Sequence, residues 1–167
     1  RFDYFSYNYS DYPKIYDLRN DLDAVLMVVS PMDEHGYFST GPYFGETLGM
    51  LRNAKHVYVE VNKYMPRTFG QNFIHISQVE ALCEKDEPIF ELPVGEPSEN
   101  DYKIGDLIAP MVPDEATIQI GIGGVSGALG KALAGKKDLG IHTEMFSDAM
   151  VDLIECGAVT NEKKTFH

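Results

Sequence analysis

The sequence predicts an α/β fold in which strands alternate with helices and pair mostly in parallel. Two observations lead to this prediction. Two apolar runs of strand length, 24–30 and 56–61, enclose a stretch with the composition of a helix. The same succession of strand, helix and strand is predicted again within 116–141. Because parallel strands need long crossover connections, usually helices, this order is typical of parallel sheets.

In the first part of the chain, apolar runs and Pro and Gly residues indicate where helices, strands and loops begin and end. We expect a helix over 13–20, after a tyrosine-rich start. The run AVLMVVS at 24–30 is apolar throughout, which is typical of a parallel strand buried on both faces. Residues 31–41 contain proline and glycines and are predicted to be a loop. A helix over 44–53 and a strand over 56–61 (HVYVEV) complete this part.

The middle of the chain is less regular. Residues 73–83 have a mixed pattern, and 89–92 form a short apolar run that predicts a strand. The stretch GEPSEN at 95–100 is polar and holds Pro and Gly, so it is the best candidate for a linker. A helix over 101–111 follows, and a turn at 113–114 ends it.

The last part repeats the alternation in a shorter form. We expect a strand over 116–120, a helix over 126–134, a strand over 139–141 and a helix over 148–155. Between the first strand and helix lie three glycines, Gly121, Gly123 and Gly124.

Composition excludes several classes of function. The 167 residues carry a net charge of −12, which argues against nucleic-acid binding because phosphate contacts need clustered Lys and Arg. No apolar run approaches the roughly 18–20 residues of a membrane span, and no signal peptide is visible, so we expect a cytoplasmic protein without membrane contact. Cys83 and Cys156 lack metal or redox spacing and predict reduced thiols. Because the chain starts at Arg1 without an initiator Met, we expect a piece of a longer polypeptide.

The glycine turn is the first candidate site. Glycines permit positive φ and close approach of a ligand to the backbone. At a junction from strand to helix, backbone N–H groups form a concavity for an anion or for an oxyanion developing on a carbonyl. The alternative is a tight turn that serves only packing.

A dinucleotide site is the competing interpretation. Residues 121–126 approximate G-x-G-x-x-G, and Glu144 follows the first glycine by 23 residues, as a ribose-binding acid does. Ser126 replaces the third glycine, however, and Gly127 comes one position late.

Glu144 follows the second strand, where a carboxylate faces the ligand crevice of an open α/β sheet. It is therefore expected beside the glycine turn, either as a nucleophile, as a ribose ligand or as a solvated surface group. Desolvation and a preformed oxyanion hole would raise its reactivity toward an activated acyl group. His142 shares its side of the strand by alternation and is a possible orienting group.

Two polar segments follow the strands of the first part. Asp33 and His35 are compatible with a metal or acid–base pair, with a hydrogen-bonded turn, or with a wall of the substrate pocket. Arg67 is equally compatible with a fork onto a carboxylate or phosphate and with a structural ion pair. Gln71 and Asn72 are candidates for the carboxylate pocket by position alone.

Long motifs give the chain a family resemblance. They are VSPMDEHGYFSTG at 29–41, EVNKYMPRTFG at 60–70, IQIGIGG at 118–124 and LGIHTEMFSD at 139–148. The sequence resembles the acetyl-CoA hydrolase/transferase family, and within it the 4-hydroxybutyrate and butyrate CoA-transferases. The resemblance implies two similar α/β halves of the NagB/RpiA/CoA-transferase type, here only partly present. Residues 1–97 would end the first half and 98–167 would begin the second.

The resemblance also implies an enzyme mechanism. Glu144 would attack an acyl-CoA thioester and pass through a glutamyl-CoA thioester. The residues expected to line the CoA pocket are Gly121, Ile122, Gly123, Gly124 and Val125. Coenzyme A and acyl-CoA would be substrates beside a short carboxylic acid, with no tightly bound cofactor and no metal, and the assembly would be a homodimer.

Three alternatives stay open at this point. Water could replace the acceptor acid, which would make the protein an acyl-CoA hydrolase with the same glutamyl intermediate. The glycine motif alone also fits an NAD(P)-binding oxidoreductase. The residues present could instead form only a structural or CoA-binding portion, with the chemistry completed elsewhere.

Overall fold

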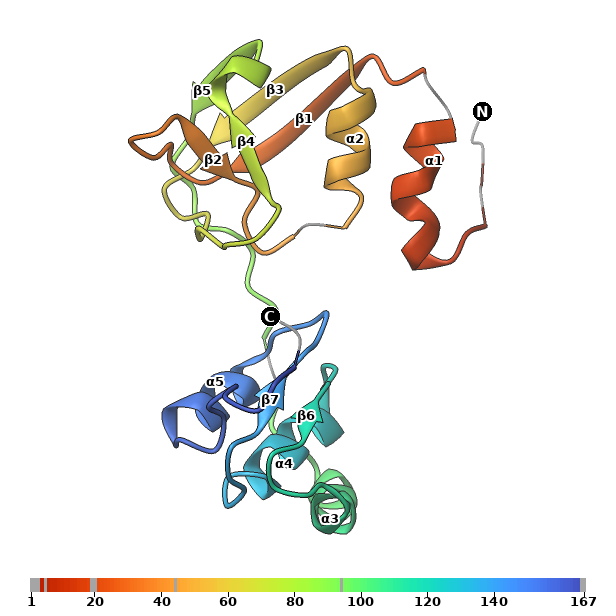
Figure 1. The fold of residues 1–167 in the computed structure, drawn as a ribbon, viewed down its shortest axis with the longest axis vertical. Helices are drawn as coiled ribbons and strands as arrows, with labels where there is room; N and C mark the ends of the chain where they lie inside the picture. The colour runs from red at the N-terminus through yellow and green to blue at the C-terminus, as the bar shows by residue number, and fades with distance from the viewer. Residues whose placement is uncertain (1–3, 5, 19–20, 44, 94, 166–167) are drawn as a thin grey trace. The chain divides into compact units, whose positions relative to one another are not determined.

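The structure is a computed structural model, and it divides into two compact units, residues 1–91 and 92–167 (Figure 1). The residues that it describes are 4, 6–18, 21–43, 45–93 and 95–165. Both units combine helices with parallel strand pairs, so the predicted α/β fold class is confirmed.

A three-stranded parallel sheet forms the centre of the first unit. Its strands are β1 (Ala24–Val29), β3 (His56–Val61) and β5 (Ala81–Glu84), in the order β1-β3-β5. β1 and β3 pair along their whole length, from Ala24 opposite His56 to Val29 opposite Val61. The strands predicted at 24–30 and 56–61 are therefore confirmed, and β5 begins in the mixed region 73–83 and ends one residue beyond it.

Two helices lie side by side in this unit (Figure 1). They are α1 (Tyr12–Leu18), which follows the short helix η1 (Tyr9–Asp11), and α2 (Thr47–Asn53). α2 is shorter than the predicted helix 44–53, whose first residue lies outside the described residues, as do residues 19 and 20 of the predicted first helix. A Cβ on Gly49 would come within 2.6 Å of the Pro13 carbonyl oxygen, so a larger residue would separate the two helices.

A small antiparallel pair replaces part of the predicted loop 31–41. β2 (Tyr37–Ser39) pairs with β4 (Phe73–His75), which leads into the short helix η2 (Ile76–Gln78). The prediction was wrong here because three residues are too short to show a strand pattern. Their partners are also more than 30 residues further along the chain.

The sheet of the first unit is buried on one face only. Its core consists of Val25, Val29, Phe38, Val57, Val59 and Ile74. On β1 the alternate position Leu26 is 77% exposed, so the expectation that the strand is buried on both faces was wrong for this unit. Within the described residues, β2, β4 and α2 supply side chains to one face of the sheet, and an apolar sequence cannot show how many faces are covered.

The strand predicted at 89–92 is also absent. This segment has no regular secondary structure, and the Phe90 side chain is fully exposed. Pro88 and Pro93 flank it, and because proline has no N–H it cannot donate to a strand ladder.

The second unit is a strand–helix–strand motif with two further helices. Its elements are α3 (Glu99–Ile108), η3 (Ala109–Met111), β6 (Thr117–Ile118), α4 (Gly124–Ala132), β7 (Gly140–Ile141) and α5 (Asp148–Glu155). β6 and β7 are parallel, and Val159 adds a parallel bridge to Leu139. The core consists of nine residues: Ala109, Ile120, Leu133, Leu139, Ile141, Met150, Leu153, Ala158 and Val159.

Helix boundaries in the second unit follow local hydrogen bonds. α3 begins before the predicted residue 101 because Ser98 and Asp101 form a reciprocal capping box. α4 begins at Gly124, before the predicted residue 126, whereas α5 has the predicted bounds. None of the helices in the described parts of the chain is long and apolar enough to cross a membrane.

The packing of the second unit predicts a large difference between two leucines. Leu133 is 0% exposed at the end of α4, whereas Leu107 on α3 is 74% exposed. Leu133→Ala should lower the free energy of unfolding by about 2–5 kcal/mol, because it leaves a cavity in the core. Leu107→Ala is the matched control and should change it by less than about 0.5 kcal/mol. Urea unfolding followed by NMR signals of α4 and α5 measures both, and equal effects would contradict the core assignment.

Candidate active site

The ends of β6 and β7 bring the glycine turn and the segment of Glu144 together. Ile118 and Ile141 are register partners, and the His142 amide donates to the Ile118 carbonyl over 3.0 Å. Beyond the ladder, the Thr143 hydroxyl lies 3.2 Å from the carbonyl oxygen of Ile120 and 3.0 Å from that of Met145. The residues next to these contacts are Gly121 and Glu144, so the two loops are tied at the carboxyl ends of parallel strands.

Two of the glycines are required by geometry. Gly123 has φ of 112°, which L side chains rarely adopt, and it is the N-cap of α4. A Cβ on Gly124 would lie 2.3 Å from Oδ2 of Asp101, the carboxylate that caps α3. The turn therefore serves close packing between helices as well as access to the backbone.

The N-terminal turn of α4 opens into a pocket of about 230 Å³. Within the described residues no side chain caps this end of the helix, so its first N–H groups have no side-chain acceptor. The lining residues that carry polar side chains are Glu96, Ser126, Lys131, Ser147, Asp148 and Asp152. The hydroxyl oxygen of Ser147 is buried and has no hydrogen-bond partner among the residues that the structure describes.

The charge of this pocket argues against a pyrophosphate. Its lining includes three carboxylates, those of Glu96, Asp148 and Asp152, and one Lys. Lys131 lies 3.5 Å from Glu96 and donates to the Tyr102 hydroxyl over 2.9 Å. These contacts raise the pKa of Lys131, so it stays charged and already paired. Polarised amides in an acidic pocket suit a neutral carbonyl better than the dianionic linkage of a dinucleotide.

The predicted site residues are only partly gathered in this pocket. Gly121, Ile122 and Gly123 line it, whereas Gly124 and Val125 form the first turn of α4 behind it. The polar residues at the start of α5 were not predicted from the sequence, although Ser147 followed by Asp148 is a typical helix start.

Glu144 itself is exposed in this unit, and it is not among the pocket's lining residues. The expectation of a dry carboxylate is therefore not met by the described residues of this unit. His142 is exposed as well.

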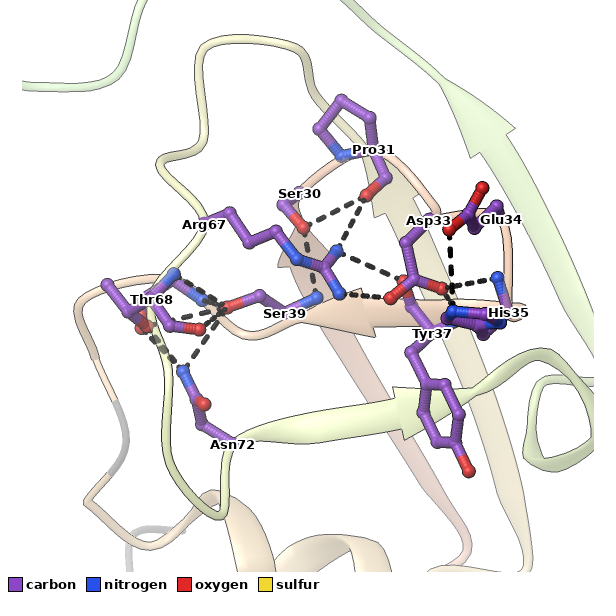
Figure 2. A network of polar contacts seen from close by, with 11 residues as sticks. Ser30, Pro31, Asp33, Glu34, His35, Tyr37, Ser39, Arg67, Thr68 and Asn72 are labelled. Atoms are coloured by element: carbon purple, nitrogen blue, oxygen red, sulfur yellow. Dashed lines mark hydrogen bonds and ion pairs between the residues drawn. The ribbon is translucent and has the colours of Figure 1, made fainter.

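The polar motif residues of the first unit form a network of their own (Figure 2). Asp33 accepts hydrogen bonds from the backbone amides of Tyr37 (2.8 Å) and His35 (3.0 Å). Arg67 pairs with Asp33 at 2.5 Å, and its guanidinium donates to the carbonyls of Pro31 and Tyr37. It also lies 5.0 Å from the ring centre of Phe73.

This network supports a structural role for both residues. The side chains of Asp33 and Arg67 are each 28% exposed, and Arg67 donates to the carbonyls of Pro31, after β1, and of Tyr37, at the start of β2. The Asp33 side chain closes the turn, which favours the hydrogen-bonded turn over a metal or acid–base pair. No group of three or more potential metal-ligating His, Cys, Asp or Glu side chains occurs among the residues that the structure describes.

A second part of the network surrounds Ser39 (Figure 2). The Ser39 hydroxyl accepts hydrogen bonds from the amides of Gly41 and Thr68 and from the Asn72 side chain. Thr68 donates its hydroxyl to the Gly41 carbonyl over 2.6 Å. Asn72 is buried within this network, so it supports the loop rather than facing a ligand with its amide nitrogen.

Comparison with known proteins identifies the family. Residues 1–92 match the N-terminal domain of acetyl-CoA hydrolases and transferases. The chain belongs to the acetyl-CoA hydrolase/transferase family. This confirms the resemblance that the sequence motifs indicate.

Members of the acetyl-CoA hydrolase/transferase family with similar sequences include two curated enzymes. The succinyl-CoA:cyclohexane-1-carboxylate CoA transferase of Geobacter metallireducens is 45% identical over 87% of this chain and 33% of its own length. The 4-hydroxybutyrate coenzyme A transferase of Clostridium kluyveri is 38% identical over 100% of this chain and 39% of its own length. The chain thus spans between a third and two fifths of these relatives.

A solved structure supports the same fold. RipA from Yersinia pestis is 40% identical and superimposes with a TM-score of 0.92, covering 98% of this chain and 38% of RipA. The crystal structure of a 4-hydroxybutyrate CoA-transferase from Porphyromonas gingivalis is 39% identical, with a TM-score of 0.88, and covers 95% of this chain and 41% of its own. The α/β fold is therefore shared with a CoA-transferase structure.

The Arg67 network predicts that lysine cannot replace this arginine. Arg67→Lys should lower the free energy of unfolding of the first unit by about 1–3 kcal/mol, because an ammonium cannot serve a carboxylate, two carbonyls and an aromatic face at once. Arg52→Lys is the control, since Arg52 pairs with Asp17 at the exposed surface. Urea denaturation of the two variants measures the difference, and an Arg67→Lys protein as stable as the control would contradict the structural role.

Asp33 adds a dependence on pH. The amide of Tyr37, the amide of His35 and the charge of Arg67 lower the pKa of Asp33 in the folded state. The contribution of Asp33 to folding stability is therefore fully present above its unfolded-state pKa of about 4. It is lost as pH falls through the lower pKa of the folded state. Asp33→Asn should lower stability at neutral pH and make the acid decline less steep. Denaturation midpoints of wild type and variant between about pH 6 and pH 3 measure this, and parallel curves would contradict it.

Proposed function

We propose that the whole protein is a CoA-transferase that moves CoA between a short acyl-CoA and a short carboxylate. Family membership supports an enzyme of acyl-CoA chemistry. Relatives that match most of this chain, between 38% and 45% identical, are named CoA-transferases. Their names include 4-hydroxybutyrate, butyryl-CoA and acetate, which belong to the class of substrate we propose here.

One observation carries the proposal: the hydrogen bond from Thr143 to the Ile120 carbonyl. It holds the segment of Glu144 against the start of the glycine turn, whose helix N-terminus has no side-chain cap. A nucleophile and a set of polarised amides at one strand edge are the two components that acyl transfer requires.

The first chemical steps build a thioester on the enzyme. A Glu144 carboxylate oxygen attacks the thioester carbonyl carbon, the C–S bond breaks, and CoA leaves as the thiolate. The thiolate then attacks the glutamyl carbonyl of the resulting anhydride, which releases the first carboxylate and leaves glutamyl-CoA. Amides of the turn at Gly121–Val125 would stabilise the oxyanion that develops in each step.

The remaining steps reverse the sequence on the acceptor. The acceptor carboxylate attacks glutamyl-CoA and expels the thiolate, which gives a second anhydride. The thiolate attacks the acceptor's acyl carbon, so the new acyl-CoA forms and the Glu144 carboxylate is restored. No net proton, electron or water molecule is consumed.

Because Glu144 is exposed, the proposed mechanism requires that its carboxylate lose water. A hydrated carboxylate is a weak nucleophile, so water must be displaced when the substrate binds. Contacts to the large nucleotide and pantetheine of CoA can provide the binding energy for that displacement. We infer that residues outside this unit complete the enclosure.

The wider organisation follows the same proposal. The first unit would be the end of one CoA-transferase half, and the second unit the beginning of the other. A homodimer and a cytoplasmic location, implied by the family resemblance and by composition, stay predictions.

Glu144 can be tested by trapping in the whole protein. Incubation with acyl-CoA followed by borohydride should reduce the glutamyl thioester to an alcohol at Glu144, found by peptide mass mapping. Glu144→Gln should lose more than about a thousandfold in kcat, as expected when a nucleophile is removed. Glu155→Gln changes an exposed glutamate at the end of α5 and serves as the control.

The release of free acid from acyl-CoA by the whole protein distinguishes a transferase from a hydrolase. A transferase releases free acid from acyl-CoA much faster when an acceptor carboxylate is present, whereas a hydrolase does not need one. A label on another residue, or full activity in Glu144→Gln, would overturn the assignment of the nucleophile.

A further inference from the structure

The strand that leads to Glu144 is hydrogen-bonded along both of its edges. On the edge that faces β6, the Gly140 and His142 amides donate to carbonyls of the β6 segment over 2.9 and 3.0 Å. On the opposite edge, residues 158–161 run beside β7 and are joined to it by a parallel bridge. Both edges therefore determine where the chain lies as it leaves β7 toward Glu144.

The opposite edge of β7 is completed by a side chain instead of the backbone. At the start of this edge, the Leu139 amide donates to the Ala158 carbonyl over 2.9 Å, and the Leu139 carbonyl accepts from the Thr160 amide over 3.1 Å. Two residues later, the Ile141 amide donates to Oδ1 of Asn161 over 2.9 Å. The side chain of Asn161 thus takes the place of a strand carbonyl at the last residue of β7.

The backbone of Asn161 turns away from β7 at this point. Its φ is 60°, in the left-handed region, which Asn and Asp tolerate best among residues with a side chain. The Lys164 amide closes the turn, because it donates to the Asn161 carbonyl over 3.1 Å. Ile141 is a core residue that is 8% exposed, so removing the acceptor of its amide is unfavourable. Position 161 therefore requires both a left-handed backbone and a side-chain acceptor.

Ile141 is also the last strand residue before the candidate nucleophile. Glu144 follows it by three residues, and between them the Thr143 hydroxyl contacts the Ile120 carbonyl at the glycine turn over 3.2 Å. The Glu144 side chain forms no hydrogen bond or ion pair with the described residues, so its placement depends on its backbone. That backbone is held by Asn161 at one edge of β7 and by the start of the glycine turn at the other.

We propose that Asn161 is a positioning residue of the CoA-transfer reaction. Its side-chain oxygen fixes the end of β7, and thereby the direction in which the backbone carries Glu144 toward the glycine turn. A misplacement of about 1 Å between reacting groups costs on the order of a hundredfold in rate, so a loosened strand end affects the chemical step. The inference rests on the function proposed above, and it assigns to Asn161 a role that acts only through the backbone of β7.

Two substitutions separate the requirements of position 161, and a third serves as the control. Asn161→Gly keeps the left-handed backbone and removes the acceptor. Asn161→Asp keeps both, because aspartate tolerates this conformation and offers a side-chain oxygen at the same place. Thr160→Ala is the matched control in the same segment, since the Thr160 hydroxyl donates to Asp138 and accepts from the Glu162 amide, not from β7.

Amide hydrogen exchange of the whole protein, with selective ¹⁵N labels on isoleucine, glycine and histidine, tests the anchor. In Asn161→Gly the Ile141 amide should exchange about three- to tenfold faster than in wild type, because its hydrogen bond is lost. The amides of Gly140 and His142 donate to the β6 side and should exchange as in wild type. Unchanged exchange at Ile141, or equal acceleration of all three amides, would overturn the assignment.

Steady-state kinetics of the whole protein test the positioning role, at a temperature where all variants are folded. Asn161→Gly should lower kcat about tenfold and change KM for acyl-CoA by less than about twofold, because alignment is lost while CoA contacts remain. Asn161→Asp should recover most of the wild-type kcat, and Thr160→Ala should keep it. A kcat of Asn161→Gly equal to that of Thr160→Ala, or an Asn161→Asp protein as impaired as Asn161→Gly, would contradict the proposal.

The activity of the wild-type protein separates a failure of this inference from a failure of the proposed function. If the wild type transfers no CoA, the proposed function fails and the positioning role fails with it, although exchange at Ile141 still reports the anchor. If the wild type transfers CoA and Asn161→Gly does so equally well, only the positioning role fails.

Discussion

The structure depends on pairing the polar groups of the chain where it leaves the parallel strands. Backbone groups that no longer join a ladder must find other partners if they are buried. After β1 these partners come from the Ser30, Ser39 and Asp33 side chains, and after β6 from the Thr143 hydroxyl. Such pairing fixes the loops at the carboxyl ends of the strands, the place where open α/β sheets bind ligands.

This requirement gives the family motifs of the first unit a physical meaning. Arg67 and Asp33 lie where a substrate contact was conceivable, yet their bonding capacity is directed to the loop itself. Two buried oxygens of this region, the Thr40 hydroxyl and the side-chain oxygen of Asn72, have no hydrogen-bond partner among the described residues.

Electrostatics separates the chemistries that a glycine turn can support. A phosphate-binding turn and an oxyanion-stabilising turn both use helix N–H groups, so the motif alone cannot distinguish them. Here the carboxylates of Glu96, Asp148 and Asp152 surround the pocket, and the one lysine is already paired. That surrounding favours a neutral carbonyl and agrees with acyl transfer rather than with dinucleotide binding.

The sequence by itself determined the fold class, the main strands, the last helix and the family. Apolar runs at 24–30 and 56–61 and the pattern of 148–155 are local signals, and the motifs are continuous in sequence. Tertiary structure alone decided the pairing of β2 with β4, the contacts of Arg67 and the exposed face of β1. The pairing of β2 with β4 and the contacts of Arg67 join segments about 30 or more residues apart. The exposure of β1 depends on which faces of the sheet other elements cover. A pattern along the chain records neither, because burial and pairing are properties of the packed whole.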